Sequence, residues 1–520
     1  MLMPAVPARR LVLPLVVLMV GLSACSGSLA QPSAAQVIEP WTGVIEQPAI
    51  TPTPTPTEPP QPSLFPGPVG AGTTRPTPTP DAARSAPAFR TTSDVHYVGP
   101  GDTLNGIAYR YGVGVQQLMQ ANGLFDPNFL TVGQQLFVPA SEPLPAGPSL
   151  KLLPDSELVY GPSASYFNTH QTVSGYGGAL DGYREEVEGE LLSGDEIVEL
   201  VARRYSVHPK LLLAVLEYSA GWVTQPQVSP AQRQFPVGLL DMTREGMFSQ
   251  VSWAADQLNA GFYLWRAGWA GPYLFPDGRV APPGTGINAA TAGVQYLYAQ
   301  LHPYDAWQQV VGPQGFLAVY QHLFGDPFDW AVEPLVPDAL VQPPLQLPFE
   351  RGAVWSFTSG PHGAWGGGSA WAALDFAPPG FALGCVWSDA WITAVADGEV
   401  VRTDLGVVIQ DLEGDGFEGL GWSIVYLHVD GRERVEQGVR LAAGDRIGHP
   451  SCEGGVSNGT HLHLARKYNG VWIEADGGLP FEMDGWQSAG TGVEYDGTLI
   501  SGQGVLEACS CRDEGNQISR

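Results

Sequence analysis

The sequence predicts a multidomain protein in which a long linker rich in proline and threonine precedes a small βααβ module, an α-helical middle domain and an antiparallel β-sheet domain. Three observations support this prediction. The 520 residues are too many for a single hydrophobic core. The 65 glycines and 47 prolines predict long segments without helix or strand. The spacing of apolar residues changes from a helical to a strand period near residue 346.

An export signal is predicted at residues 1–24. Two arginines precede an apolar run at 11–22, which is too short to cross a bilayer as a mature helix. The run ends in Leu-Ser-Ala before Cys25, and this sequence resembles the lipobox of bacterial lipoproteins. The resemblance implies acylation of Cys25 and a lipid anchor that holds the protein at the membrane of the cell envelope. An ordinary secretion signal is the alternative, and either interpretation exports the protein.

Composition predicts a linker after the export signal, and the net charge limits the kinds of partner that the chain can bind. Residues 25–94 are rich in Pro, Thr, Ser, Ala and Gly, so they bury too little apolar surface to fold and are predicted to be a disordered linker. The formal net charge is −27. This charge argues against a nucleic acid partner and against electrostatic capture by anionic lipid or anionic wall polymer.

The segment 95–139 reads as two short strands that flank two short helices. Asp102 or Thr103 is placed to cap the first helix, and Gly112 to end it. With its closing segment Gly133-Gln-Gln-Leu-Phe-Val-Pro139, the module resembles a LysM module over its full length. The resemblance implies a glycan-binding module whose partner is peptidoglycan. A similar small fold with another ligand is the alternative.

A second linker is predicted at 140–182, and a helical domain at 183–345. Ser193-Gly-Asp-Glu196 forms a capping box in front of apolar residues at helical spacing. His208-Pro209 opens another helix, and residues 253–266 read as a further, mostly buried helix.

Glu217 is the candidate acid of this helical domain. It lies late in an apolar helix and is followed by Tyr218 and Ser219. This arrangement resembles lysozyme-like lytic transglycosylases, in which the catalytic glutamate ends a helix, and it implies a glycosidase acid with a raised pKa. The Gly-Leu-Met-Gln segment of that family is matched only in part by Val237-Gly-Leu-Leu240. An inert or substrate-binding domain is therefore the alternative.

Beyond residue 346 the pattern favours strands, which are predicted at 399–402, 407–410, 422–428 and 461–468. Asn469-Gly470 predicts a hairpin from the last of these strands to 471–474. Residues 346–490 are therefore predicted to form an antiparallel sheet domain with many loops. Residues 491–520 are predicted to be a tail without a motif.

Half of the ten histidines lie in this sheet domain: His362, His428, His449, His461 and His463. Residues i and i+2 of a strand point to the same face, so His461 and His463 are predicted to face one site. His428 stands at the end of another predicted strand. Catalytic zinc takes three N or O ligands and leaves a fourth position for water. A His-x-His pair supplies one or two of these ligands.

Three motifs follow the order found in lysostaphin-type (LytM-like) zinc peptidases: Tyr426-Leu-His428, Gly444-Asp-Arg-Ile-Gly448 and Gly459-Thr-His-Leu-His463. Most of that family begins its metal site with histidine, three residues and aspartate, but here Trp371 precedes Asp375 at that spacing. The Gly-rich segment Ser359–Gly368 resembles the beta-lytic branch instead, in which the histidine stands well before the aspartate.

The beta-lytic resemblance implies a complete site. It implies that the cofactor is Zn2+ and that three residues bind it: His362, Asp375 and His463. It further implies that His461 takes the proton of the attacking water and passes it to the leaving amine. His428 would support the tetrahedral oxyanion or share this proton transfer. His449 is left as a loop histidine.

Four cysteines follow Cys25 and allow three pairings. Cys385 with Cys452 is the favoured disulfide, because both lie inside the proposed catalytic domain. The segment Asp411–Glu418 alternates acidic residues with glycine, which favours a solvated hairpin loop over a Ca2+ site.

These observations predict an exported peptidoglycan hydrolase, a zinc metalloendopeptidase that cleaves wall peptide cross-links while a LysM module holds it on glycan. Two alternatives stay open. One is an inert wall-binding protein that activates another hydrolase. The other is a glycosidase that acts through Glu217.

Overall fold

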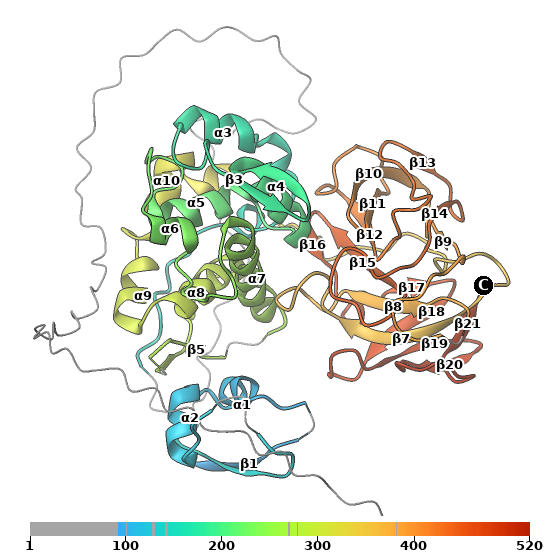
Figure 1. Cartoon of the computed structure of the whole chain (residues 1–520), viewed down its shortest axis with the longest axis horizontal. Helices are drawn as coiled ribbons and strands as arrows, with labels where there is room; N and C mark the ends of the chain where they lie inside the picture. Colours follow the sequence, from blue (N-terminus) through green and yellow to red (C-terminus); the bar gives the residue numbers. More distant parts are fainter. Residues whose placement is uncertain are drawn as a thin grey trace, which may run out of the picture. The chain divides into compact units, whose positions relative to one another are not determined.

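The computed structural model describes these residues: 92–99, 101–126, 130–140, 144–268, 271–277, 279–380 and 382–520. The predicted export signal, Cys25 and nearly all of the linker at 25–94 lie outside these ranges. Within them, the helices are too short or too polar to cross a membrane. The described chain has three parts, which Figure 1 colours blue, green to yellow, and orange to red.

The first part has the predicted βααβ order. Its elements are β1 (Asp94–Tyr97), α1 (Leu104–Tyr111), α2 (Val115–Asn122) and β2 (Gln135–Val138), and β1 pairs with β2 antiparallel. At the start of α1 the hydroxyl of Thr103 accepts the amide hydrogen of Gly106 at 3.0 Å, and Gly112 follows the helix at φ +59°. The side-chain amide of Asn122 makes two hydrogen bonds to the main chain of Phe137, which fixes α2 against β2.

The middle part is helical. Its α-helices are α3 (Thr169–Tyr176), α4 (Gly194–Tyr205), α5 (Pro209–Ala220), α6 (Pro230–Gln234), α7 (Met247–Arg266), α8 (Ala289–Leu301), α9 (Tyr304–Val310) and α10 (Phe316–Phe324). Two hairpins, β3 (Arg184–Val187) with β4 (Glu190–Ser193) and β5 (Tyr273–Leu274) with β6 (Val280–Ala281), complete it.

The predicted helix ends are present. Ser193 and Glu196 form a reciprocal capping box at α4, and His208 caps α5, whose first residue is Pro209. Between α7 and α8, Gly261 permits a close approach of the two helices. A Cβ there would lie 2.6 Å from the carbonyl oxygen of Ala292. The two longest helices of this part therefore pack at backbone distance (Figure 1).

The predicted second linker at 140–182 is wrong over most of its length. Leu152, Leu153 and Leu158 are fully buried in the core of the helical part, and α3 lies inside the same segment. The segment is rich in Gly, Pro and Ser, but its short apolar clusters find partners on the long helices. Tertiary packing therefore orders a segment that local composition marks as a linker.

The third part contains two principal sheets. Its strands are β7 (Val354–His362), β8 (Ala373–Ala377), β9 (Ile392–Thr393), β10 (Gly398–Asp404), β11 (Val407–Asp411), β12 (Trp422–Leu427), β13 (Arg440–Leu441), β14 (Arg446–Gly448), β15 (Leu462–Tyr468), β16 (Val471–Trp472), β17 (Glu482–Met483), β18 (Trp486–Gly490), β19 (Gly497–Ser501), β20 (Gly504–Glu507) and β21 (Gln517–Ser519). Among the described residues, the larger sheet has the order β13-β10-β11-β12-β15-β8-β7-β21, with β16 paired to β15. The smaller sheet has the order β17-β18-β19-β20.

The register of the larger sheet brings distant residues together. His463 of β15 pairs with Asp375 of β8 and with Leu427 of β12, and His362 of β7 pairs with Ala373 of β8. All of these pairs are antiparallel, as predicted. Strand β7 carries two irregularities in its last residues, so its end bends before His362.

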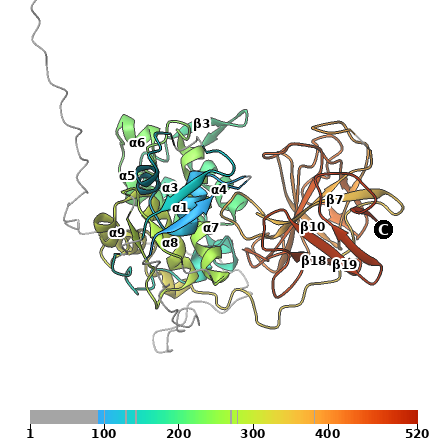
Figure 2. The same cartoon turned by 90° about the horizontal axis from the view of Figure 1, so that it is seen from below.

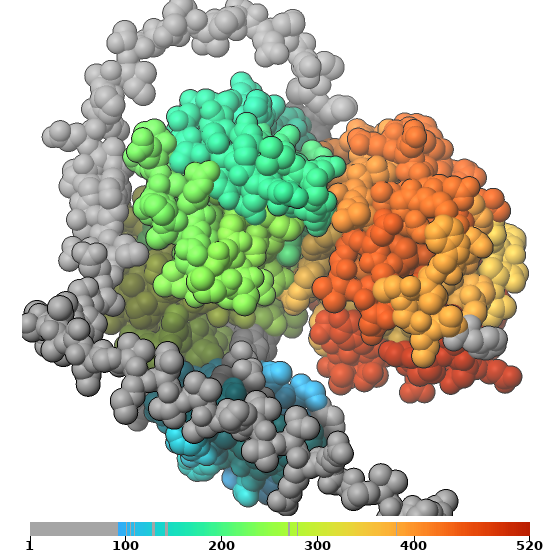
Figure 3. Space-filling view, viewed as in Figure 1, coloured from blue at the N-terminus to red at the C-terminus, as the bar shows by residue number. Residues whose placement is uncertain are grey.

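The predicted tail at 491–520 is also wrong. Strands β18, β19 and β20 pair in order, and β21 forms the edge of the larger sheet beside β7. In Figure 2, β18 and β19 lie beside the sheet that contains β7 and β10. The red C-terminal residues in Figure 3 accordingly lie against the orange residues of the sheet part. These strands are short and rich in glycine, so sequence periodicity does not mark them.

Candidate metal centre

Three buried side chains meet at the centre of the larger sheet. His362 ends β7, Asp375 lies in the middle of β8, and His463 is the second residue of β15. They are the three residues to which the beta-lytic resemblance points, and their candidate ligand atoms all lie within 4.8 Å of one another. His362 Nε2 is 3.0 Å from His463 Nδ1, and each of these nitrogens is 3.2 Å from Asp375 Oδ1.

Main-chain carbonyls orient both imidazoles. His362 Nδ1 lies 2.8 Å from the carbonyl oxygen of Gly360, and His463 Nε2 lies 3.0 Å from that of Ala364. Each of these nitrogens carries the hydrogen, because a carbonyl only accepts. The lone pairs of the other two nitrogens therefore point at Asp375 Oδ1, which itself receives no hydrogen bond within the described structure.

With both rings neutral, three acceptors face one another without a hydrogen between them, an arrangement that could hold a cation. The separations also fit one, since a tetrahedral ion with bonds of about 2.0–2.1 Å holds neighbouring ligand atoms about 3.3 Å apart. Burial raises the pKa of Asp375, but the charges that protonated His362 and His461 would carry outweigh it, so the net shift is well below its usual range. With both imidazoles neutral, a bound cation would supply that positive charge instead. Two histidines and one carboxylate suit catalytic zinc and also occur in non-haem iron sites.

His461 and His428 border this cluster. His461 lies just before β15, and its Nε2 is 3.6 Å from Asp375 Oδ2. Its Nδ1 lies 2.7 Å from the carbonyl oxygen of Gly459, so Nε2 carries the lone pair of the neutral ring. His428 lies just beyond β12, with its ring centroid 4.5 Å from that of His461. The structure thus brings together all five predicted site residues.

His428 has an unusual backbone and an unusual environment. Its φ is +67°, in the left-handed region that residues other than glycine adopt uncommonly. Burial, then the charges of His461 and His463, lower its pKa to about 3. Its Nδ1 hydrogen is bonded to the carbonyl oxygen of Glu453 at 2.8 Å. Neutral His428 therefore offers an acceptor at Nε2 and has no hydrogen there for an oxyanion.

Tyr495 is the site residue that the sequence reasoning missed. Its ring stacks on the His362 imidazole with centroids 4.7 Å apart and planes 24° apart. Two main-chain hydrogen bonds hold it, from Gly360 N–H to the Tyr495 carbonyl at 2.7 Å and from Tyr495 N–H to the Pro361 carbonyl at 3.1 Å. Burial, followed by the charges of Glu494 and Asp375, raises the pKa of its phenol. No motif or spacing in the segment predicts this role.

The other singled-out residues have structural partners away from the cluster. Both ring nitrogens of His449 are used, by the carbonyl oxygen of Ala390 at 2.9 Å and by Glu433 at 3.0 Å. This agrees with its interpretation as a loop histidine. The segment Asp411–Glu418 is predicted to be a solvated loop, but only its middle is exposed. Asp411 is buried, and its carboxylate accepts the amide hydrogens of Glu413 and Gly416.

Glu217 lies in the last turn of α5. Its carboxylate accepts the amide hydrogens of Val223 at 2.9 Å and of Thr224 at 3.0 Å, together with the Thr224 hydroxyl at 2.5 Å. These three hydrogen bonds fix the loop after the helix. A glycosidase acid is expected in an apolar pocket, whereas this carboxylate lies among hydrogen-bond donors.

One disulfide lies near the centre. The structure joins Cys385 to Cys452, the favoured pair, and also joins Cys509 to Cys511. Ser451 N–H donates to the His428 carbonyl at 2.7 Å, one residue before Cys452. The disulfide therefore anchors the segment whose main chain is hydrogen-bonded to the carbonyl of His428.

Comparison with known proteins agrees with this arrangement. Residues 96–139 match the family described as LysM domain, and residues 151–336 match the family described as LasA, N-terminal domain. The chain carries a LysM domain and a LasA-like domain. The likeness of the helical part to lytic transglycosylases stays a prediction.

Similar proteins include a protease and a metalloendopeptidase. Protease LasA of Pseudomonas aeruginosa is 27% identical over 352 residues, which are 64% of this chain and 77% of that protein. Beta-lytic metalloendopeptidase of Achromobacter lyticus is 29% identical over 160 residues, which are 29% of this chain and 40% of that protein. A solved structure of the M23 metalloprotease pseudoalterin from the deep sea aligns with 35% of this chain and all of its own, at 19% identity and a TM-score of 0.28.

Proposed function

We propose that this chain is an exported zinc metalloendopeptidase that cleaves the peptide cross-links of peptidoglycan and is held on the glycan by its LysM domain. One observation carries the proposal. His362 Nε2, His463 Nδ1 and Asp375 Oδ1 converge at 3.0–3.2 Å with only acceptors facing inward. The names of the similar proteins, a protease and a metalloendopeptidase, support the same class of reaction.

Zinc held by these three residues would polarise the scissile carbonyl and acidify the attacking water. His461 Nε2, whose lone pair faces the cluster, takes the proton of that water and delivers it to the leaving amine. The main-chain bond of His461 to Gly459 keeps this nitrogen free and oriented.

His428 shares the proton transfer rather than donating to an oxyanion. In its neutral form the one hydrogen of the ring is bonded to Glu453, so Nε2 only accepts. Its ring centroid is 4.5 Å from that of His461, so its free Nε2 would accept a hydrogen bond from the attacking water or from protonated His461 and orient the proton that His461 carries. Of the two roles that the family resemblance allows, this geometry favours proton transfer.

The two alternatives make different predictions about purified peptidoglycan. Digestion followed by mass spectrometry of the new ends separates them. The proposal expects new amino termini that disappear with chelator and in His463→Ala, and that persist in the matched loop variant His449→Ala. Anhydro-sugar ends that depend on Glu217 would assign the chemistry to the helical part. No release by zinc-loaded protein would favour a binding protein that activates another hydrolase.

Attachment to the membrane through acylated Cys25 is also part of the proposal and rests on the lipobox-like sequence alone. The proposed division of the chain places the peptidase between residues 346 and 520, with the C-terminal strands included because β21 completes the larger sheet.

A further inference from the structure

A second cavity lies beside the Gly-rich segment that carries His362. Its volume is about 890 Å³, within the range of roughly 300–1,000 Å³ that is typical of ligand sites. Residues 367–371 form one wall, and α7 and α8 form another. The same segment therefore borders the candidate metal centre through Ala364 and this cavity through Ser369 and Trp371.

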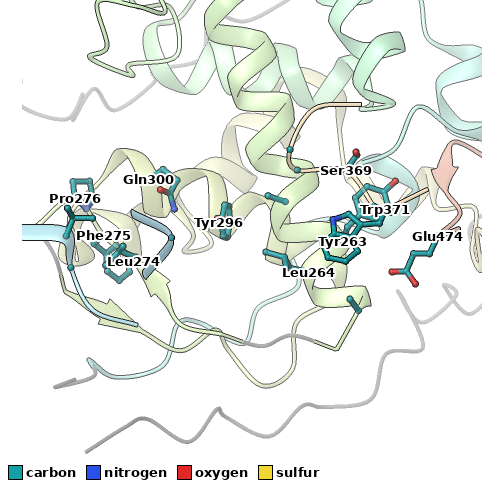
Figure 4. Close-up of a pocket in the computed structure, with 18 of the residues that line it drawn as sticks. Tyr263, Leu264, Leu274, Phe275, Pro276, Tyr296, Gln300, Ser369, Trp371 and Glu474 are labelled. Carbon is teal, nitrogen blue, oxygen red and sulfur yellow. The ribbon is translucent and has the colours of Figure 1, made fainter. Parts of the chain in front are cut away.

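The two ends of the cavity differ in chemistry. Figure 4 shows Tyr263, Trp371 and Glu474 at one end and Leu274, Phe275 and Pro276 at the other. Tyr296 and Gln300 lie between them. One end is therefore aromatic and acidic, and the other is apolar.

The acidic end is built from two connected segments. Ala475 N–H donates to the carbonyl oxygen of Trp371 at 2.8 Å, which places Glu474 and Asp476 beside the tryptophan. Trp472 N–H donates to the Tyr263 hydroxyl oxygen at 3.0 Å, which fixes the second ring at this end. The wall is thus held by main-chain hydrogen bonds from both sides.

The negative charge at this end is compensated only in part, by the nearby Arg266. Glu474 and Asp476 are both half-buried, and neither carboxylate forms an ion pair or accepts a hydrogen bond within the described structure. Burial, then the charge of Asp476, raises the pKa of Glu474, although Arg266 acts weakly in the other direction. A positive group between the two carboxylates would offset both the burial of their charge and the repulsion between them.

We infer that this cavity binds a peptide segment that carries a free primary ammonium group next to apolar residues. The ammonium would lie between Glu474 and Asp476, over the rings of Trp371 and Tyr263, where carboxylates and aromatic faces both stabilise a cation. The apolar neighbours would contact Leu274 and Phe275. A neutral sugar would satisfy the rings but would leave the two carboxylates unpaired.

Calorimetry on the full chain with a matched pair of probes tests this inference. The probes are N-acetyl-Leu-Ala-Lys amide and the same peptide with its lysine Nε acetylated. Charged hydrogen bonds of this kind predict that the first probe binds at least about tenfold more tightly. The preference should vanish in Glu474→Gln combined with Asp476→Asn. It should persist in the control Glu482→Gln combined with Glu507→Gln, which removes the same charge from exposed positions of the sheet part.

Chelator should leave this binding unchanged, which separates the cavity from the metal centre. Three results would overturn the inference. The first is equal affinity for both probes, and the second is no binding of either probe. The third is competition by tetra-N-acetylchitotetraose, which displaces the lysine probe from the wild-type chain but not from Trp371→Ala. The last result would assign the cavity to glycan. Circular dichroism of each variant confirms that it is folded.

Discussion

A buried ion cluster in the larger sheet allows the free-energy effect of one substitution to be predicted. Glu418 lies 2.7 Å from Arg402 of β10 and 2.8 Å from Lys467 of β15, and all three side chains are at most 10% exposed. Burial disfavours the ionised carboxylate, but the charges of Arg402 and Lys467 outweigh it and lower the pKa of Glu418 to about 2. From an ordinary value of 4.5, this shift corresponds to about 3 kcal/mol in favour of the folded state.

The perturbation is Glu418→Gln, which leaves buried Lys467 without its carboxylate partner and leaves Arg402 with only Asp404, at 3.7 Å. Loss of one member of a buried ion cluster costs about 3–5 kcal/mol. Unfolding of a multidomain chain is not two-state, so the assay is hydrogen exchange of the amides of β12 and β15. Their protection should fall by at least about 100-fold in the variant.

The pH dependence has a definite sign. Because the pKa of Glu418 is lowered on folding, its contribution is complete above pH 4.5 and is lost as the pH falls toward 2. The variant should lack this acid-dependent loss. The matched control is Glu399→Gln, whose partner Arg440 is 73% exposed, and it should cost at most about 1 kcal/mol. Equal protection in the two variants would refute the reasoning.

Three further predictions concern the centre and the anchor. Replacing Cys385 and Cys452 by serine should destabilise the sheet part by about 2–5 kcal/mol, measured by hydrogen exchange of its core strands; unchanged exchange would contradict a bridge in the folded protein. Tyr495→Ala should weaken metal affinity about 10- to 100-fold, because it removes the ring that stacks on His362. Tyr495→Phe keeps the ring and should retain the affinity in the same metal titration. An equal loss in both variants would assign the effect to the phenol hydroxyl instead. Cys25→Ala should move the full-length protein from the membrane fraction to the soluble envelope fraction on cell fractionation; retention in the membrane would exclude a lipid anchor at this residue.

The parts of the site that follow local rules could be predicted from the sequence. His461 and His463 are predicted to face one site because strand residues alternate. Asp375, which lies opposite His463 in the pairing of β8 with β15, is reached only through the family resemblance, since no strand is predicted at its position. The position of His362 could be reached only by resemblance, since irregular pairing bends the end of β7. The usual family motif of histidine, three residues and aspartate would have placed the first ligand at Trp371, whose side chain instead lines the second cavity.

What could not be predicted depends on contacts between distant segments. Tyr495 reaches His362 through a turn between two short strands, and no periodicity precedes it. The segment at 152–158 is ordered by the helices that bury it, not by its own composition. The acceptor role of His428 depends on a hydrogen bond to Glu453, which is 25 residues away in the chain.

The central claim is that His362, Asp375 and His463 hold a catalytic zinc ion, and metal analysis of purified full-length protein tests it most directly. Wild type and the loop variant His449→Ala should each contain about one zinc per chain and release new amino termini from peptidoglycan. His362→Ala should lose both the metal and the release. Zinc content and cleavage that stay at the wild-type level in His362→Ala would contradict the account.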